Sequence, residues 1–351
     1  MVSDSPLSTL RVLIPDGEFG HTLKIVRCLV RSSLAETVSV HVGARGAISQ
    51  TTRLSRLVAG FHPLPAPLSD EEYVQALVHL ARTVQADVLL PGSVEGNLVI
   101  ARHRQAFEGV VAVAPLASEK TVHLARDKGR LAQFMTTHDI PQPPVIPMRP
   151  VATLRERSSD LSFPVLLKAT ASGGGLYINQ ADDTDALIQQ ATVLDDEPRD
   201  YIVQSYVEGD DLCYCVLARG GHVLAHTIQR AFAPPVQSFS PLDFIEFVHN
   251  SHAEAVGRKL VGALQYTGVA CIDFRYDEAH DALNVLEINP RFWRSLLGSL
   301  RAGVNFPELA CREALNLSLP ATPYDEIRYS VGELSLKHLG RTVKQGISLR
   351  N

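Results

Sequence analysis

The sequence predicts an α/β domain with a parallel sheet, followed by an α+β half whose strands pair as antiparallel hairpins. Three observations lead to this prediction. Apolar strands alternate with helical segments over residues 10–118, five prolines fall within residues 140–150, and hairpins with glycine turns follow. Alternating strands and helices are typical of parallel sheets flanked by helices, whereas short glycine turns join antiparallel strands.

The first half opens with the short apolar strand LRVLIPDG, and the helical spacing of HTLKIVRCLVRSS follows it directly. The same alternation continues with predicted strands at 37–43 and 86–93 and predicted helices at 70–85 and 94–104. Polar residues that directly follow a parallel strand lie at the sheet edge where open α/β sheets bind ligands. Glu18, His21 and Glu95 occupy such positions, so they are candidate substrate contacts, with plain loop polarity as the alternative.

A proline-rich segment divides the chain. IPQPPVIPMRP follows one predicted helix over 124–139 and cannot continue a helix or a central strand. Beyond it, FPVLLKA and GLYINQ form one predicted hairpin, and the residues on either side of Gly220-Gly221 form another. We therefore expect domains at 1–118, 119–210 and 211–351.

Composition favours small-molecule chemistry. The chain has 351 residues, a net charge of -5 and a pI near 6.2, so it offers no basic surface for nucleic acid or anionic lipid. No apolar run reaches the roughly 18 residues of a membrane span, and no signal peptide is apparent at the N-terminus. Five cysteines without a C-x-x-C pair indicate reduced thiols. We expect a cytoplasmic protein.

The segment NVLEINPRFW (284–293) carries polar residues at alternate positions of an apolar strand. Side chains alternate between faces, so Glu287 and Asn289 share one face, while Leu286 and Ile288 are expected in the core. If this strand pairs with residues 269–276 across a loop at 278–282, Asp273 lies directly opposite Glu287.

Two opposed carboxylates repel each other unless a cation lies between them. Asp273, Glu287 and the Asn289 amide are hard oxygen ligands that suit Mg²⁺, and exposed, solvated carboxylates are the alternative. A phosphate site would support the metal, and Lys168 precedes a turn at Gly173, Gly174 and Gly175 whose backbone could approach phosphates. The turn fits neither a Walker A loop nor a dinucleotide fingerprint, and a flexible hairpin loop is its alternative reading.

Five segments together resemble the motifs of the ATP-grasp superfamily, which includes biotin carboxylase, carbamoyl phosphate synthase and the D-alanine ligases. In order, they are ARDKGRLAQFM before IPQPP, FPVLLKATASGGG, YIVQSYVEGDDL, GVACIDFR and NVLEINPRFW. The resemblance covers nearly the whole chain. It implies a Rossmann-like N-terminal domain, followed by an ATP-grasp fold with antiparallel sheets, and ATP with Mg²⁺, or alternatively Mn²⁺, as the cofactors.

The resemblance also implies roles for individual residues. Phosphate contacts fall on Lys128, Lys168 and the glycine turn, the metal on Asp273, Glu287 and Asn289, and phosphoryl or acyl-phosphate stabilisation on Arg291. Gln204 stands where relatives often have a glutamate that faces the adenine amino group. The remaining nucleotide contacts fall on Ser205, Tyr206, Val207 and Asp211.

The implied reaction is a ligation in which ATP activates a small carboxylic acid as an acyl phosphate and an amine attacks it. Arg230 is a second candidate for transition-state stabilisation, with a surface salt bridge as its alternative. Trp293 either walls the substrate pocket or belongs to the core, and Cys213 and Cys215 are expected to pack. A carboxylase that uses carboxyphosphate and a nucleotide-binding module without turnover remain alternatives. Expected partners are the carboxylate and amine substrates, and a homodimer is left open.

Overall fold

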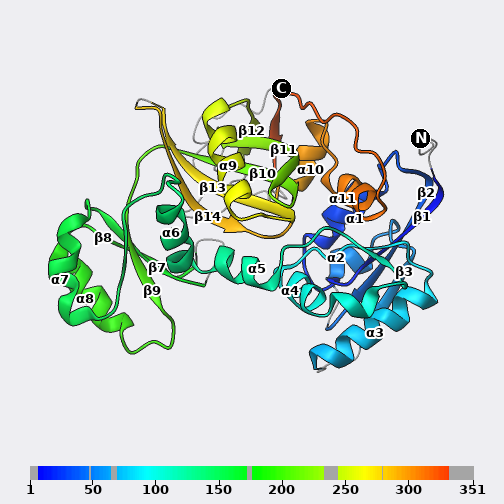
Figure 1. Cartoon of the computed structure of the whole chain (residues 1–351), viewed down its shortest axis with the longest axis horizontal. Coiled ribbons are helices and arrows are strands. Elements are labelled where there is room, and N and C mark those ends of the chain that lie inside the picture. The colour runs from blue at the N-terminus through cyan, green and yellow to red at the C-terminus, as the bar shows by residue number, and fades with distance from the viewer. Residues whose placement is uncertain are drawn as a thin grey trace.

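The computed structural model describes residues 7–46, 49–64, 69–171, 176–232, 244–278 and 280–331. Three β-sheets lie side by side along the longest axis, each with its own helices (Figure 1). The six-stranded sheet lies in the middle, between the N-terminal sheet and a four-stranded sheet. None of the helices within the described ranges is both long and apolar enough to cross a membrane.

The N-terminal sheet has five parallel strands in the order β3-β2-β1-β4-β5, as the alternating pattern predicted. Apolar residues of β1 are buried on both faces, which is typical of a parallel sheet covered by helices. The capping box of Ser69 and Glu72 begins the longest of these helices. The elements are β1 (Leu7–Ile14), α1 (Thr22–Leu29), β2 (Ala35–Ala44), α2 (Gln50–Arg53), β3 (Gly60–Pro63), α3 (Asp70–Thr83), β4 (Val88–Leu89), α4 (Val94–Arg102), η1 (Arg104–Phe107) and β5 (Ala112–Val113).

Two helices, α5 (Glu119–Arg126) and α6 (Lys128–Thr137), connect this sheet to the others, where the sequence predicted one helix over 124–139. Asp127 interrupts the helix because its backbone is extended, and its carboxylate accepts hydrogen bonds from the amides of Gly129 and Arg130 at 3.0 Å each. An aspartate in this position is an N-cap and begins a new helix. Lys128 therefore occupies the first position of α6, where it is buried.

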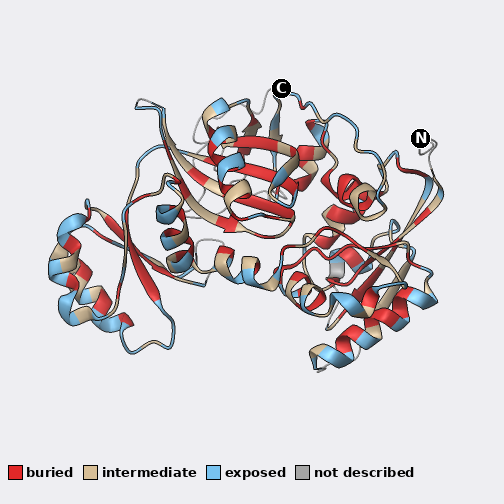
Figure 2. Ribbon diagram, viewed as in Figure 1, coloured by how far each residue is buried: buried red, intermediate tan, exposed pale blue. Residues whose placement is uncertain are grey.

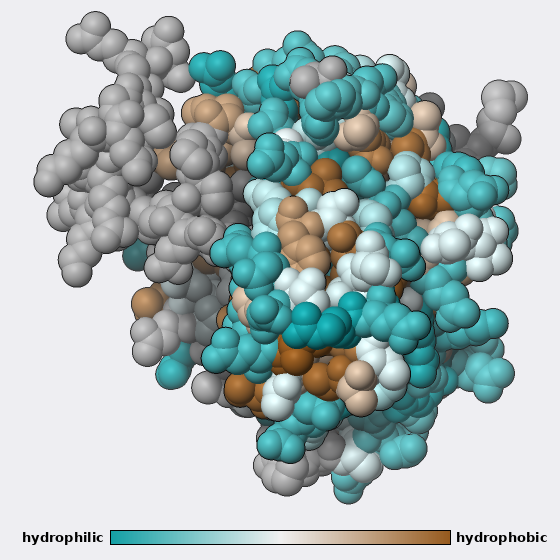
Figure 3. Space-filling model, turned by 90° about the vertical axis from the view of Figure 1, so that its left-hand side faces the viewer, coloured by the Kyte–Doolittle hydropathy of each residue, from teal (hydrophilic) through white to brown (hydrophobic). Residues whose placement is uncertain are grey.

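The four-stranded sheet is antiparallel, in the order β6-β9-β7-β8. Its proline-containing strand β6 lies at an edge, because proline cannot donate to a second neighbour. Seen from the end that carries this sheet and its helices, the described surface is mainly hydrophilic with small hydrophobic areas (Figure 3). Its elements are β6 (Val145–Pro147), η2 (Val151–Thr153), α7 (Leu154–Arg157), η3 (Ser158–Asp160), β7 (Val165–Ala169), β8 (Ile178–Ala181), α8 (Thr184–Leu194) and β9 (Tyr201–Ser205).

The six-stranded sheet is also antiparallel, in the order β14-β13-β10-β11-β12-β15. All three predicted hairpins of the second half are present, two in this sheet and one, β7 with β8, in the four-stranded sheet. Strand β10 lies between β13 and β11 and is apolar along most of its length. The elements are β10 (Asp210–Arg219), β11 (His222–Ala231), β12 (Phe244–Phe247), α9 (Ser251–Ala263), β13 (Gly268–Asp277), β14 (Ala282–Asn289), α10 (Leu296–Arg301), α11 (Phe306–Ala314) and β15 (Arg328–Ser330).

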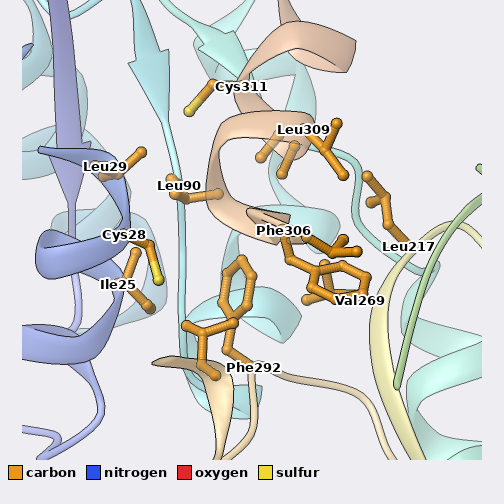
Figure 4. Packing of buried hydrophobic residues seen from close by; sticks show 14 of the residues in the cluster. Ile25, Cys28, Leu29, Leu90, Leu217, Val269, Phe292, Phe306, Leu309 and Cys311 are labelled. Carbon is orange, nitrogen blue, oxygen red and sulfur yellow. The ribbon is translucent and has the colours of Figure 1, made fainter. Parts of the chain in front are cut away.

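One hydrophobic core joins the N-terminal sheet to the six-stranded sheet. Helix α1 faces helix α11 across this core, with Cys28 and Leu29 on one side and Phe306 and Leu309 on the other (Figure 4). Buried residues are concentrated in the central strands and on the helix sides that face them (Figure 2). Because this contact is apolar and continuous, it holds the N-terminal sheet against the six-stranded sheet and α11.

Candidate functional site

A large cleft lies where the three sheets meet. It has a volume of about 1320 Å³, more than the roughly 300–1,000 Å³ of a pocket for one small molecule. Residues from the N-terminal sheet loops, α5, α6 and the other two sheets line it. The cleft therefore has room for more than one ligand.

The floor of the cleft carries the opposed carboxylates that the hairpin register predicted. Asp273 of β13 pairs directly with Glu287 of β14, and both line the cleft. The register then shifts, since Phe274 pairs with Val285 and Leu286 has no partner. This bulge turns Leu286 out of the core and into the lining of the cleft, so its predicted core position is wrong, whereas Ile288 is buried as predicted.

Asn289 and Lys128 bind this carboxylate pair. The Asn289 amide donates to Asp273 Oδ2 and to Glu287 Oε1 at 3.0 Å each, and Lys128 Nζ lies 3.3 Å from Glu287 Oε2. Burial and the neighbouring Glu287 raise the pKa of Asp273. Burial would also raise the pKa of Glu287, but Lys128 and Asn289 outweigh it and lower that pKa. Three converging hard ligands and one cation suit a divalent ion beside a polyanion.

Lys168 and Gln204 form a buried pair on neighbouring strands of the four-stranded sheet. Lys168 Nζ donates to Gln204 Oε1 at 2.6 Å. Burial lowers the pKa of Lys168 to about 8, assisted by the positive charge of Lys128. A nearby anion would stabilise the charged ammonium form of Lys168 in these buried surroundings. The predicted phosphate loop at Gly173, Gly174 and Gly175 lies outside the described residues.

The predicted nucleotide segment borders the same region. Tyr206, Val207 and Asp211 line the cleft, and Arg275 reaches Asp211 at 3.1 Å. Burial raises the pKa of Asp211, although Arg275 partly offsets that effect. Ser205 also lines the cleft, and its hydroxyl accepts a hydrogen bond from the Ser162 amide at 3.0 Å, which holds the loop before β7.

The opposite end of the cleft is positively charged. Arg291 follows β14, Lys24 extends from α1, and both line the cleft together with His21 and Arg294. Lys24 Nζ donates to the Arg294 carbonyl at 2.8 Å, which joins α1 to the segment after β14. Burial, Arg291 and Lys24 lower the pKa of His21 to about 4, so the imidazole is neutral at pH 7. These residues can bind a substrate carboxylate.

Comparison with known proteins agrees with this geometry. Residues 197–335 match the family model described as "ATP-grasp in the biosynthetic pathway with Ter operon". The chain is similar to the carbamoyl phosphate synthase large chain of Methanothermobacter thermautotrophicus (24% identity, 64% of this chain, 22% of that protein) and to the D-alanine–D-alanine ligase of Ralstonia nicotianae (25% identity, 32% of this chain, 34% of that protein). It thus spans only about a fifth to a third of these relatives' length.

The chain is thus similar to ATP-grasp proteins in part of its sequence. Its fold is also similar to the biotin carboxylase domain of the 2-oxoglutarate carboxylase from Hydrogenobacter thermophilus, with a TM-score of 0.68 and 19% identity over 89% of this chain and 71% of that domain. The ATP-grasp fold therefore accounts for both antiparallel sheets and for the cleft between them.

Two of the predicted residues, Arg230 and Glu18, lie outside the described lining of the cleft. Arg230 is absent from the described lining of the cleft, because Glu246 on the neighbouring strand binds its guanidinium at 2.7 Å. Of the two predictions for Arg230, the salt bridge therefore fits the structure better than transition-state stabilisation. Glu18 lies half-buried outside the described lining, and one of its carboxylate oxygens has no hydrogen-bond partner among the residues that the structure describes. Glu95 does line the cleft, and Arg126 lies 3.9 Å from it.

Trp293 is both a core residue and a wall of the cleft, the two positions that were predicted as alternatives. Its side chain borders the cleft, yet it is buried against the edge of Phe306, with ring centroids 4.7 Å apart. The indole N–H donates to Ser299 Oγ at 3.2 Å. The tryptophan is therefore a fixed wall of the cleft.

Sequence reasoning missed several residues of this cleft. Lys24, Arg275 and Arg294 were not proposed, although Arg275 shares a strand face with Asp273 and that spacing was a usable signal. No pattern marks Lys24 or Arg294, which meet across 270 residues of sequence. Cys213 was expected to pack, yet its thiol donates to Asp273 Oδ1 at 3.1 Å and lines the cleft.

Proposed function

We propose that the protein is an ATP-dependent ligase that activates a small carboxylic acid as an acyl phosphate and joins it to an amine. One observation carries the proposal: Lys128, Lys168, Asp273, Glu287, Asn289 and Arg291 line a single cleft. A module that only binds nucleotide has no need for both carboxylates beside the cations. The ligase among the relatives, D-alanine–D-alanine ligase, supports the same class.

The nucleotide end of the cleft fits ATP with a divalent ion. Asp273, Glu287 and Asn289 would hold Mg²⁺, with Mn²⁺ as an alternative, because the two carboxylates face each other and the Asn289 amide group contacts both. The amide would present its oxygen to a bound ion after a rotation that exchanges its nitrogen and oxygen. Bound there, the ion would neutralise phosphate charge. Lys128 and Lys168 add fixed positive charge from α6 and β7, and Tyr206 and Val207 would border the base. The similar carboxylase domain was solved with MgADP.

The cationic end fits the acid. Arg291 and Lys24 would bind the substrate carboxylate and orient one of its oxygens towards the terminal phosphate. Transfer of that phosphoryl group forms an acyl phosphate and releases ADP. The amine then attacks the acyl carbon, phosphate leaves with the bonding electrons, and the amide nitrogen loses a proton. Preorganised donors such as Arg291 act most strongly on the charge that develops in these steps.

An ADP-release screen over pooled carboxylic acids and amines tests the proposal. The matched control is Glu287→Ala, which removes a proposed metal ligand. At least one pool should raise ADP release above this control in the presence of Mg²⁺. Hydroxylamine in place of the amine should then trap the activated acid as an acyl hydroxamate. If no pool exceeds the control, the ligase proposal is wrong, and turnover that depends on bicarbonate alone would indicate a carboxylase.

A further inference from the structure

Three thiols lie beside Asp273 on the floor of the cleft. Strands β10 and β13 pair Cys213 with Asp273 and Cys215 with Cys271, so all four side chains share one sheet face. The Sγ atoms of Cys213 and Cys271 lie 3.1 Å and 3.5 Å from Asp273 Oδ1. Cys215 lies behind them, with its Sγ 3.7 Å from that of Cys271.

The spacing of these atoms matches a site for a soft cation. The two sulfur atoms and a carboxylate oxygen lie within 4.8 Å of one another. Around a tetrahedral zinc ion, bonds of about 2.3 Å to sulfur and about 2.1 Å to oxygen place those ligand atoms about 3.6 Å apart. The two distances to Asp273 Oδ1 are close to that value, so a small shift of side chains would complete the geometry.

The two oxygens of Asp273 face different neighbours. Oδ1 lies against the thiols, whereas Oδ2 accepts from the Asn289 amide that also contacts Glu287. Cys213, Cys271 and Asp273 all line the cleft, so an ion bound to them could take a further ligand from it. Zinc sites with three protein ligands take a water or a substrate in the fourth position.

We propose that Cys213, Cys271 and Asp273 form a binding site for a thiophilic divalent cation of the zinc and cadmium class. Binding replaces the two thiol protons with two metal–sulfur bonds and involves no change of oxidation state. Thiolates favour soft ions over Mg²⁺, so the site discriminates by ligand chemistry rather than by charge. Because Asp273 also belongs to the proposed hard-cation site, occupancy inhibits turnover; this consequence alone rests on the proposed function.

Cys215 supports this site from behind. Gln229 Nε2 lies 3.6 Å from Cys215 Sγ, and Ser295 donates to Gln229 Oε1 at 2.7 Å. These contacts fix the thiol that touches Cys271. Partners of this kind orient metal ligands without binding the metal.

Titration of the full-length, reduced protein with Cd²⁺ tests the site. We expect one equivalent to bind with the ultraviolet charge-transfer absorption of two cadmium–thiolate bonds. Cys213→Ala and Cys271→Ala should each weaken binding by at least about 100-fold, because loss of a ligand exceeds the 10- to 100-fold cost of losing a supporting partner. Cys213→Ser, which keeps the side-chain shape, serves if the alanine variant does not fold.

Cys28→Ala is the matched control, since Cys28 is buried in α1 away from the cleft. It should bind Cd²⁺ as the wild type does. Absence of the band in the wild type would overturn the proposal, as would a band unchanged in both Cys213→Ala and Cys271→Ala. If Cys215→Ala lost Cd²⁺ binding and Cys213→Ala kept it, the metal would be bound by Cys215 and Cys271, and the proposed site would be wrong.

A second measurement separates the site from the proposed function. Glu287→Ala should still bind Cd²⁺, because that carboxylate is not one of the three ligands. In the wild type, Cd²⁺ should abolish ADP release at one equivalent, and a chelator should restore it. Turnover that persists with Cd²⁺ bound would disprove the inhibition. Absence of turnover in cadmium-free controls that contain Mg²⁺ would refute the ligase and leave the binding result intact.

Discussion

The Asn97 side chain donates a hydrogen bond to the Pro290 carbonyl at 2.9 Å, across 193 residues of sequence. Both groups are buried. Asn97 belongs to α4 at the carboxyl edge of the N-terminal sheet, and Pro290 ends the strand that carries Glu287 and Asn289. This bond therefore fixes the direction in which the chain continues to Arg291.

Asn97→Leu should weaken both stability and turnover. Leaving the buried Pro290 carbonyl without a donor costs about 1–3 kcal/mol of the free energy of unfolding. A displaced Arg291 should lower kcat/KM for the acid by about 10- to 100-fold. Asn305→Ala is the control, because Asn305 donates to the Cys28 carbonyl at 3.0 Å away from the cleft. Equal kinetic losses in both variants would contradict a positioning role for Asn97.

Asp273→Asn should stabilise the metal-free protein while it abolishes turnover. The pKa of Asp273 is raised by burial and by Glu287, so its contribution to stability is present below the unfolded pKa near 4 and is lost as the pH rises. At pH 8, in the presence of a chelator, the free energy of unfolding of the variant should exceed that of the wild type by at least about 1 kcal/mol. Urea unfolding at pH 5 and pH 8 measures both free energies of unfolding. The difference between variant and wild type must be larger at pH 8 than at pH 5.

Magnesium provides the complementary readout for the same variant. Mg²⁺ should raise the melting temperature of the wild type and leave that of Asp273→Asn unchanged, because only a folded state with intact ligands binds the ion. An equal rise in both proteins would show that the ion binds elsewhere.

Nucleotide binding should take up protons near pH 8. The pKa of Lys168 is about 8, mainly because the ammonium is buried, and phosphate beside it would raise that pKa. About half a proton should therefore bind with ATP at pH 8. Calorimetry in two buffers of different ionisation enthalpy measures the uptake. Lys168→Met should remove it, whereas substitution of the exposed Lys120 by methionine should not.

His21 should make the fold sensitive to mild acid. Its pKa is lowered to about 4 by burial and by Arg291 and Lys24, so between an ordinary 6.5 and 4 the unfolded chain binds one proton more. Stability should fall as pH decreases through this window, by up to about 1.4 kcal/mol per pH unit. The slope should be shallower in His21→Gln, and identical slopes in urea unfolding would exclude His21 as the cause.

Local periodicity was enough to predict the centre of the site. The period of two along a strand put Glu287 and Asn289 on one face. The expected loop at 278–282 put Asp273 opposite Glu287, whereas the strands pair from Asp277 with Ala282, and the bulge at Leu286 restores the predicted pair. The order of parallel and antiparallel sheets followed from equally local signals, namely alternating helices in one half and glycine turns in the other.

Tertiary contacts decided the rest. Asp127 caps a new helix and thereby points Lys128 at Glu287, Glu246 holds Arg230 away, and one bulge turns Leu286 into the cleft. By itself, the sequence determined the strand faces and the family motifs, because these depend on neighbours within a few residues. The packing of α1 against α11 brought Lys24 to Arg294, because apolar spacing marks the buried face of a helix, whereas burial of apolar surface is non-directional and does not specify which element that face packs against.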